Sequence, residues 1–229
     1  MNGNSAYFKC FDGNLDVVCN EIKKGNKWEI DLQNKLLNFN LNKNSVAIEA
    51  GTHICTHTCL LADLCKTVYG FEPFPETYEL ALENLKLNNI NNVILSNKAL
   101  SNENDKTTKV EYHNPQERNI GGWGIHFTKD KEYTISDNFI DIKLITIDSL
   151  NLNKLDLIKL DVEGNELNVI NGAIKTIIKH KPIIILEDWG INCSININTT
   201  KEKFNFLIEI GYKIENINSG SADFIFYPI

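Results

Sequence analysis

One stretch, Leu155 to Ala173 (LDLIKLDVEGNELNVINGA), constrains the fold most strongly. Its pattern is that of a buried strand, followed by an acidic turn and then by an amphipathic helix. The apolar run ends at Leu160, and Asp161, Glu163 and Gly164 follow it. Such a run is typical of a central strand in a parallel sheet that helices cover on both faces. Open α/β sheets bind ligands beyond the carboxyl ends of such strands. We therefore predict that Asp161 and Glu163 form half of an active site.

A second strand with a glycine turn occurs earlier in the chain, at Val46 to Cys55 (VAIEAGTHIC). The strand leads to Glu49, and Gly51 then allows a tight turn with close approach of the backbone to a ligand. Roughly twenty residues further on, the expected strand Thr67 to Phe71 ends at Glu72, the spacing at which a carboxylate binds a ribose diol. This spacing predicts a cofactor that contains a nucleoside.

The glycine pattern distinguishes between two cofactors of this kind. A dinucleotide needs the pattern G-x-G-x-x-G, so that its pyrophosphate can bind backbone amides at the start of the helix. Only Gly51 is present in this turn, and Glu49 precedes it while Thr52 and His53 follow it. That arrangement suits a ligand with cationic groups and no pyrophosphate, such as S-adenosylmethionine, which carries an ammonium and a sulfonium. We therefore expect a methyl donor, and the missing glycines argue against an NAD-dependent oxidoreductase.

Three motifs of the chain resemble the FkbM family of class I methyltransferases. The family has a strand-end turn Asp-x-Gly-Ala-Asn-x-Gly, a Phe-Glu-Pro at the second strand, and a block Ile-Lys-x-Asp-Val-Glu-Gly-x-Glu. The corresponding residues here are Glu49 to Cys55, Phe71 to Pro73, and Ile158 to Glu166. Supporting matches are Trp28-Glu29, Asn97 to Leu100, Thr146 to Leu150, Gly172-Ala173 and Pro182 to Glu187. The resemblance covers nearly the whole chain.

The resemblance implies an α/β protein with a Rossmann-like class I methyltransferase fold, a mostly parallel central sheet with helices on both faces and a C-terminal antiparallel hairpin. It also implies methyl transfer from S-adenosylmethionine to a hydroxyl group, often on a sugar or a polyketide-type molecule. The cofactor-binding residues that it implies are Glu49, Gly51, Thr52 and His53 at the amino acid end, Glu72 and Pro73 at the ribose, and Ala99 and Leu100 around the adenine.

The alternation of helical and extended patterns supports a parallel sheet with crossover helices. We expect helices at residues 31–39, 56–65, 75–87, 166–179 and 200–210. We expect strands at residues 46–48, 67–71, 93–95, 155–160, 183–186, 212–215 and 224–227. A chain of 229 residues is long enough for one sizeable core, so we expect a single domain with residues 1–44 as an N-terminal lead-in.

The first turn departs from the family pattern at three positions. Glu49 replaces Asp, His53 replaces Asn, and Cys55 replaces the second glycine. Cys55 adds a side chain where the methionine part of the cofactor would pass. The departures leave a second hypothesis open, in which the chain is a non-catalytic descendant that keeps the fold as a binding module. Intact acids at the other expected strand ends favour the enzyme.

Acidic residues at two neighbouring strand ends are candidates for the chemistry. We interpret Asp161, Glu163 and Glu187 as facing the acceptor. Asp161, Glu187 and Asp188 would form an oxygen cluster that can hold Mg²⁺ or Mn²⁺ and lower the pKa of a substrate hydroxyl. Without a metal, His126 or His113 is the candidate general base, because a neutral imidazole accepts a proton near pH 7. A role for Glu163 in capping the following helix is the alternative.

The segment at residues 101–140 interrupts the alternation of helices and strands. Long loops in compact domains are often functional, and Trp123 between glycines presents a flat apolar face that stacks on sugar rings. We therefore expect a substrate-facing insert with Trp123 at the acceptor. A solvated excursion with short strands of its own, among them residues 107–112, is an equally good interpretation.

Charge and composition exclude some classes of partner. A net charge of -7 with lysines scattered among acids argues against binding to nucleic acid phosphates. No apolar stretch approaches the length of a membrane span, and the first residues lack the pattern of a signal peptide. The six cysteines form no C-x-x-C pair and no zinc spacing. We expect a cytoplasmic protein that acts on a small-molecule or sugar acceptor, with oxygen or nitrogen as the methylated atom.

Overall fold

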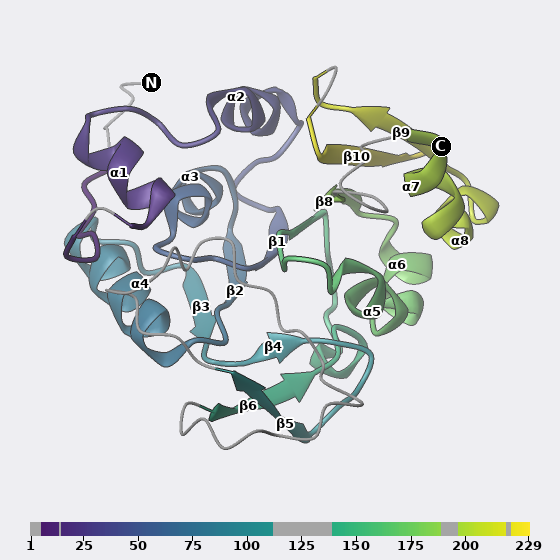
Figure 1. Ribbon diagram of the computed structural model, residues 1–229. Coiled ribbons are helices and arrows are strands. Elements are labelled where there is room, and N and C mark those ends of the chain that lie inside the picture. The colour runs from purple at the N-terminus through teal and green to yellow at the C-terminus, as the bar shows by residue number, and fades with distance from the viewer. Residues whose placement is uncertain (1–5, 14, 112–138, 189–196, 219–220) are drawn as a thin grey trace.

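A computed structural model describes residues 6–13, 15–111, 139–188, 197–218 and 221–229. Its main sheet has seven strands in the order β3-β2-β1-β7-β8-β10-β9 (Figure 1). The strands from β3 to β8 pair in parallel, and β10 is antiparallel to both β8 and β9. This arrangement confirms the predicted fold, with a mostly parallel sheet and an antiparallel hairpin at the C-terminal end of the chain.

The strands of the main sheet are β1 (Val46–Ala50), β2 (Thr67–Phe71), β3 (Val93–Ser96), β7 (Leu157–Leu160), β8 (Ile183–Glu187), β9 (Tyr212–Asn216) and β10 (Asp223–Pro228). A smaller sheet contains β4 (Ala99–Leu100), β5 (Lys106–Glu111) and β6 (Phe139–Ile145). The helices are α1 (Val17–Lys23), α2 (Ile30–Asn38), α3 (Thr56–Leu64), α4 (Pro75–Leu87), α5 (Glu166–Asn171), α6 (Ile174–His180), α7 (Ile197–Lys203) and α8 (Asn205–Glu209), with a 3-10 turn η1 at Asp148–Leu150. None of the helices in these described ranges is both long and apolar enough to cross a bilayer.

Helices cover both faces of the main sheet, which explains why its central strands are apolar on both sides. In Figure 1 the sheet runs diagonally, with α2 and α3 on one side and α5 to α8 on the other. Ala47 and Leu157 pack into the core under α2 and α3, while Ile48 and Ile158 pack into the core under α5 to α8. All four residues are completely buried. Burial on two faces is the reason that the strand at residues 157–160 reads as a continuous apolar run.

Several predicted elements agree with the structure, and two predicted helices are wrong in one respect. The helix at 75–87 and the strand at 67–71 have the predicted bounds. The expected helix at 166–179 is interrupted after Asn171 and resumes at Ile174. At the interruption, a Cβ atom on Gly172 would lie 2.0 Å from the carbonyl oxygen of Ser101. The absence of a side chain at Gly172 therefore allows its backbone to pack closely against that of Ser101. The expected helix at 200–210 is also divided, with Phe204 between α7 and α8.

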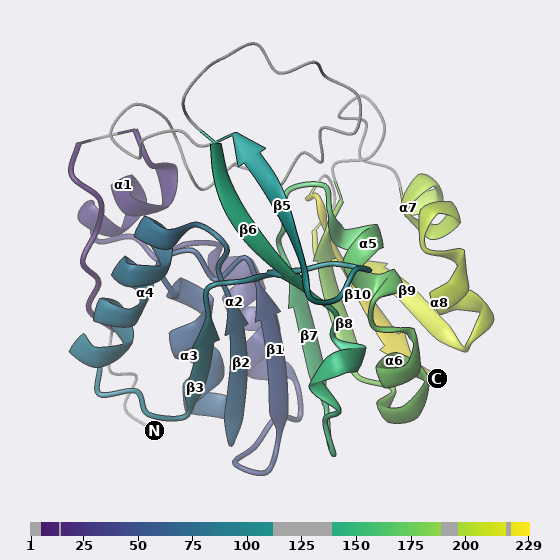
Figure 2. The same cartoon turned by 90° about the horizontal axis from the view of Figure 1, so that it is seen from below.

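The segment at residues 101–140 contributes strands to the smaller sheet. The structure confirms a strand near 107–112, as β5, and adds β6, which the sequence did not predict. Figure 2 shows β5 and β6 crossing in front of the main sheet. Residues 112–138, which contain Trp123 and His126, lie outside the described part of the chain.

The N-terminal lead-in contains a helix, α1, that the sequence did not predict. Asp16 caps this helix, and its carboxylate accepts a hydrogen bond of 2.7 Å from the backbone N–H of Cys19. Val18 and Cys19 pack against Ile54, which belongs to the turn between β1 and α3. The lead-in is therefore attached to the turn that was predicted to bind the cofactor.

The order of the strands reverses at β1, since the chain continues from β1 to β2 on one side and returns as β7 on the other. A crevice opens beyond the strand ends at such a point, where ligands of α/β proteins bind. The backbones are close there, and the N–H of Asp161 donates a hydrogen bond of 3.1 Å to the carbonyl of Ala50. A Cβ atom on Gly51, which has a φ of +77°, would lie 1.7 Å from the carbonyl oxygen of Asp161.

We expect the Gly51→Ala substitution to lower the free energy of unfolding by at least about 2 kcal/mol, because it adds a backbone clash to an unfavourable φ. Gly25→Ala is the matched control, since Gly25 has a φ of +82° and a Cβ atom there would meet nothing within 4 Å. Urea denaturation of both variants measures the difference. Equal losses in the two variants would contradict the proposed contact between β1 and β7.

Candidate active site

A cavity of about 950 Å³, including its opening to solvent, lies beyond the ends of β1, β2, β7 and β8. Residues from several parts of the chain line the cavity, among them Trp28 and Glu29, Gly51 to His53, Glu72 to Phe74, Lys98 to Leu100, Asp161 to Glu163, and Glu187. The structure therefore brings together most of the residues that the sequence predicted for the cofactor and the acceptor.

Glu72 is buried just after the end of β2, with 4% of its surface exposed. Its two carboxylate oxygens accept hydrogen bonds from the backbone N–H groups of His53, at 3.0 Å, and Phe74, at 3.1 Å. Burial raises the pKa of Glu72 to about 7. The charge of His53 and the two hydrogen bonds from backbone N–H groups act in the opposite direction. A carboxylate has about four acceptor positions, so Glu72 retains capacity for two hydroxyl groups of a ribose.

The turn after β1 has left-handed backbone conformations at Gly51, His53 and Cys55. Cys55 has a φ of 71°, so it adopts the conformation for which glycine is the usual residue. Its side chain is completely buried in an apolar cluster with Cys59, Ala81 and Leu85. Among the described residues that line the cavity, Cys55 does not occur. The expected obstruction of the cofactor by Cys55 is therefore wrong.

His53 binds the N-terminal lead-in through an ion pair, with 3.1 Å between its Nε2 atom and Oδ2 of Asp16. Burial alone would lower the pKa of His53, but the hydrogen bond with Asp16 and its negative charge raise it above the usual value. Burial would likewise raise the pKa of Asp16, but His53 lowers it to about 2. The contact therefore favours the charged forms of both residues and holds α1 against the turn.

Glu49 does not contact the cavity, which corrects its predicted role at the amino acid end of the cofactor. Its side chain is buried in the protein beside Lys159, with 3.8 Å between Oε1 and the Nζ atom. Lys159 is also 3.2 Å from Oδ2 of Asp161. Burial would lower the pKa of Lys159, but Asp161 and Glu49 raise it above its usual range. Lys159 therefore remains charged and balances acids on two neighbouring strands.

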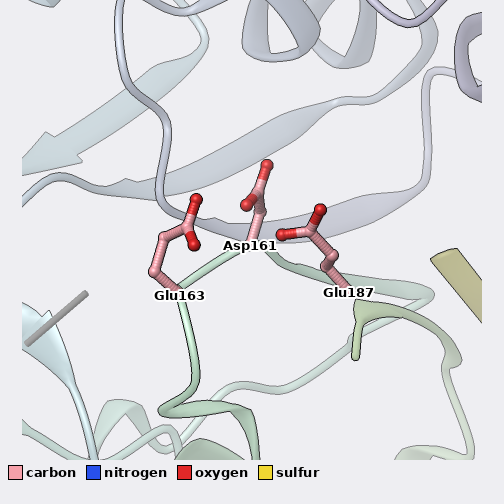
Figure 3. A group of neighbouring side chains, drawn as sticks. All are labelled: Asp161, Glu163 and Glu187. Carbon is pink, nitrogen blue, oxygen red and sulfur yellow. The ribbon is translucent and has the colours of Figure 1, made fainter. Parts of the chain in front are cut away.

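Asp161, Glu163 and Glu187 converge at one rim of the cavity, as Figure 3 shows. One oxygen atom of each carboxyl group lies within 4.8 Å of those of the others. Burial, followed by the negative charge of Asp161, raises the pKa of Glu163 to about 7 and that of Glu187 to about 9. We name these three residues the acidic group. It can accept a proton from a bound molecule or bind a cation.

Asp188 lies apart from this group, which corrects its predicted place among the metal ligands. It follows Glu187 at the end of β8, and its carboxylate faces the helix that follows instead. Asp188 accepts a hydrogen bond of 2.7 Å from the hydroxyl of Thr200 and forms an ion pair of 2.8 Å with Lys203. Consecutive residues of a strand point to opposite faces, so Glu187 and Asp188 do not meet at one site.

The remaining predicted residues divide into two sets, and a third set lines the cavity without having been predicted. Thr52, Pro73, Ala99 and Leu100 line the cavity as expected. His113, Trp123 and His126 lie outside the described residues. Glu29, His57 and Lys98 also line the cavity, although no role was predicted for them. The resemblance to the family at Trp28-Glu29 was the one sequence feature that could have indicated Glu29. No sequence feature indicated His57.

Polar atoms without partners test whether a polar cofactor fits the cavity. Within the described ranges, Oγ1 of Thr52, Nδ1 of His53 and Oγ1 of Thr77 are buried and have no hydrogen-bond partner. All three residues line the cavity. Buried polar atoms normally have partners, so these atoms fit a ligand with several polar groups, as S-adenosylmethionine has.

Comparison with known proteins identifies the family of the chain. The family model of the methyltransferase FkbM domain matches residues 42–214. The crystal structure of methyltransferase FkbM from Methylobacillus flagellatus KT is similar, with a TM-score of 0.56 and 17% identity over 83% of this chain. The match covers 45% of that protein. No curated protein matches the chain.

Two further solved structures have lower scores. An rRNA methylase from Streptococcus thermophilus has a TM-score of 0.49 and 12% identity, and the match covers 87% of this chain and 95% of that one. A precorrin 8w decarboxylase from Methanobacterium thermoautotrophicum has a TM-score of 0.49 and 15% identity, and the match covers 88% and 90% of the two chains.

We expect Asp16→Asn to reduce the free energy of unfolding by about 1.5–3 kcal/mol at about pH 5.5, because it removes a charged hydrogen bond. The raised pKa of His53 stabilises the fold below the unfolded value of 6.5, and this stabilisation is lost as the pH rises through the folded value. The lowered pKa of Asp16 stabilises the fold above 3.8, and this is lost as the pH falls toward about 2. The deficit of the variant should therefore shrink at about pH 9. Urea titrations at both pH values measure it, and an equal deficit would show that the pair is not charged.

Proposed function

Because the chain belongs to the FkbM methyltransferase family, we propose that it is an S-adenosylmethionine-dependent O-methyltransferase for a hydroxyl group of a sugar, a glycan or another small molecule. One observation carries this proposal. A single cavity contains Glu72, which suits a ribose, and the acidic group, which suits an acceptor that must lose a proton. S-adenosylmethionine, when bound, supplies a methyl group that is open to direct displacement.

The residues around the first turn would hold the cofactor. Glu72 offers acceptor positions to the ribose, and its bonds to the backbone of His53 and Phe74 fix its orientation. Ala99 and Leu100, which are buried and apolar, suit a flat adenine ring. Thr52 contributes a hydroxyl group that has no partner among the described residues. A cofactor held at several points orients its methyl group toward the acceptor, which is a major part of catalysis.

Within the acidic group, we assign the role of proton acceptor to Glu163. A general base is most effective when its pKa lies near the working pH, and the pKa of Glu163 is raised to about 7. Glu187, with its pKa raised to about 9, holds a proton at neutral pH and can donate a hydrogen bond to the acceptor oxygen. A hydroxyl group must lose a proton during methyl transfer, whereas a neutral amine can attack first, so this arrangement favours an oxygen acceptor.

A divalent cation is the alternative role of the acidic group. Carboxylate oxygens are the ligands that Mg²⁺ and Mn²⁺ take, and Asp161, Glu163 and Glu187 provide three of them. A cation would relieve the repulsion that contributes to the raised pKa values. We favour the role of proton acceptor, because Glu163 can fill it without a metal ion. The experiment below also tests whether the reaction depends on a metal.

The hypothesis of a non-catalytic binding module loses its main support in the structure. It depended on Cys55 and His53 in the first turn. The side chain of Cys55 packs away from the cavity, and His53 donates its backbone N–H to Glu72 while its ring binds Asp16. Both departures are therefore compatible with a bound cofactor.

We expect the protein to bind S-adenosylmethionine and not NAD, and Glu72→Ala to weaken the binding about tenfold or more, since it removes a buried hydrogen-bonding carboxylate. Calorimetric titration measures both affinities. Glu76→Ala is the matched control, because Glu76 is exposed on α4 four residues away and does not line the cavity. Tighter binding of NAD than of S-adenosylmethionine by the unmodified protein would refute the proposed cofactor.

We expect the turnover with a hydroxyl acceptor to rise as the pH increases through about 7, because Glu163 is active when it has lost its proton. Glu163→Gln should lower kcat about 100-fold or more and leave the affinity for S-adenosylmethionine unchanged. Transfer of a radioactive methyl group to a panel of sugars measures this rate. The product should be a methyl ether, which resists alkali.

The same assay includes arms with EDTA and with added Mg²⁺ or Mn²⁺. Turnover that survives EDTA supports Glu163 as the proton acceptor. Turnover that requires the metal, in both the unmodified protein and Glu163→Gln, would assign the acidic group to cation binding instead. A product methylated on nitrogen would contradict the oxygen acceptor.

A further inference from the structure

Glu29 lies in the wall of the cavity without an assigned role. It precedes α2 and has a φ of 45°, a left-handed conformation that is unfavourable for a residue with a side chain. Its Oε2 atom is buried and forms no hydrogen bond with any described residue. Strained backbone conformations cluster at ligand sites, and a buried polar atom without a partner is uncommon. Glu29 therefore has the features of a ligand-binding residue.

The surroundings of Glu29 indicate that this ligand is a cation. The ring of His57 lies close to this carboxylate, with 3.4 Å between its Nε2 atom and Oε2 of Glu29. Burial and then the charge of Lys159 lower the pKa of His57 well below its usual value, so His57 is neutral and does not balance the carboxylate. Lys159 lowers the pKa of Glu29, but it also pairs with Glu49 and Asp161, and burial still raises the pKa of Glu29 to about 7. A carboxylate in this environment gains most from a ligand that brings its own positive charge.

The position of Glu29 in the cavity indicates which part of the cofactor would meet it. Glu72 marks the ribose at the end of β2. The turn at Gly51 to His53 donates the N–H of His53 to Glu72 and leads from β1 to α3, and His57 belongs to the first turn of that helix. Glu29 contacts His57, so it lies where the cavity continues past the turn. The amino acid end of S-adenosylmethionine extends from its ribose, and this part of the cavity is available to it.

We propose that Glu29 binds the α-ammonium group of the methionine part of S-adenosylmethionine, the role that the sequence had predicted for Glu49. The inference rests on the proposed function. Glu49 cannot take this role, because it is buried beside Lys159 and does not occur among the described residues of the cavity wall. Residue 29 precedes the range of 42–214 that matches the family model. The N-terminal lead-in thereby completes the cofactor site.

Two ligands that differ only at the amino acid end test this inference. S-adenosylhomocysteine has the ammonium group and lacks the sulfonium, and 5′-methylthioadenosine has neither the ammonium nor the carboxylate. We expect Glu29→Gln to weaken S-adenosylhomocysteine about tenfold or more and to leave methylthioadenosine unchanged within about twofold, since only the former brings a charge to residue 29. Calorimetric titration gives both affinities.

Asp31→Asn is the matched control, because it removes one negative charge from the same helix start at an exposed residue. It should change neither affinity. Binding of methylthioadenosine also shows that the cavity of each variant is folded. If Glu29→Gln does not fold, Glu29→Asp is the second variant, because it keeps the charge on a side chain that is one methylene shorter. It should weaken the binding of S-adenosylhomocysteine and leave that of methylthioadenosine unchanged.

Three outcomes would overturn the inference. Unchanged binding of S-adenosylhomocysteine by Glu29→Gln would place Glu29 outside the cofactor site. Equal losses for both ligands would assign Glu29 to the shape of the cavity. If the unmodified protein binds neither ligand, the proposed function itself fails. The first two outcomes leave the proposed function intact, so the two failures are distinguishable.

Discussion

The contact between β1 and β7 is the constraint on which the rest of the site depends. The sheet reverses its strand order here, and the N–H of Asp161 donates to the carbonyl of Ala50 while Gly51 lies against the carbonyl of Asp161. A side chain at residue 51 would separate the two strand ends. Because they stay together, the first turn and Asp161 open into the same cavity. The backbone therefore determines where a methyl donor and its acceptor can meet.

A buried lysine makes this close approach electrostatically tolerable. Lys159 lies on the strand next to β1, opposite Glu49 in register, and it contacts both Glu49 and Asp161. A buried acid without a partner would cost several kcal/mol (roughly 3–5). The lysine of the block that begins at Ile158 thus has a structural reason to accompany the acids, whereas Glu163 and Glu187 on the cavity side have no lysine at salt-bridge distance among the described residues. Neither carboxyl group is tied up in an ion pair with lysine, so both are available for chemistry.

The sequence predicted the sheet, the reversal at β1 and the converging acids, because each has a local signature. Apolar runs define the strands, Gly51 defines the turn, and Asp161 and Glu187 belong to the ends of strands that pair in parallel. Other features depend on tertiary packing and were missed. The side chains of Glu49 and Asp188 point away from the cavity, unlike those of Asp161 and Glu187. This direction depends on the position of each residue along its strand. The close packing of Gly172 against Ser101 joins residues that lie far apart in the sequence, so local patterns do not reveal it.

Donor and acceptor share one cavity in the proposed reaction, with the ribose at Glu72 and the reacting centre at the acidic group. A crystal structure with S-adenosylhomocysteine tests this assignment most directly. We predict hydrogen bonds from the ribose to Glu72, the adenine beside Leu100, and the sulfur facing the rim where Asp161 lies. Electron density for the ligand in the opposite orientation, or outside the cavity, would contradict the assignment.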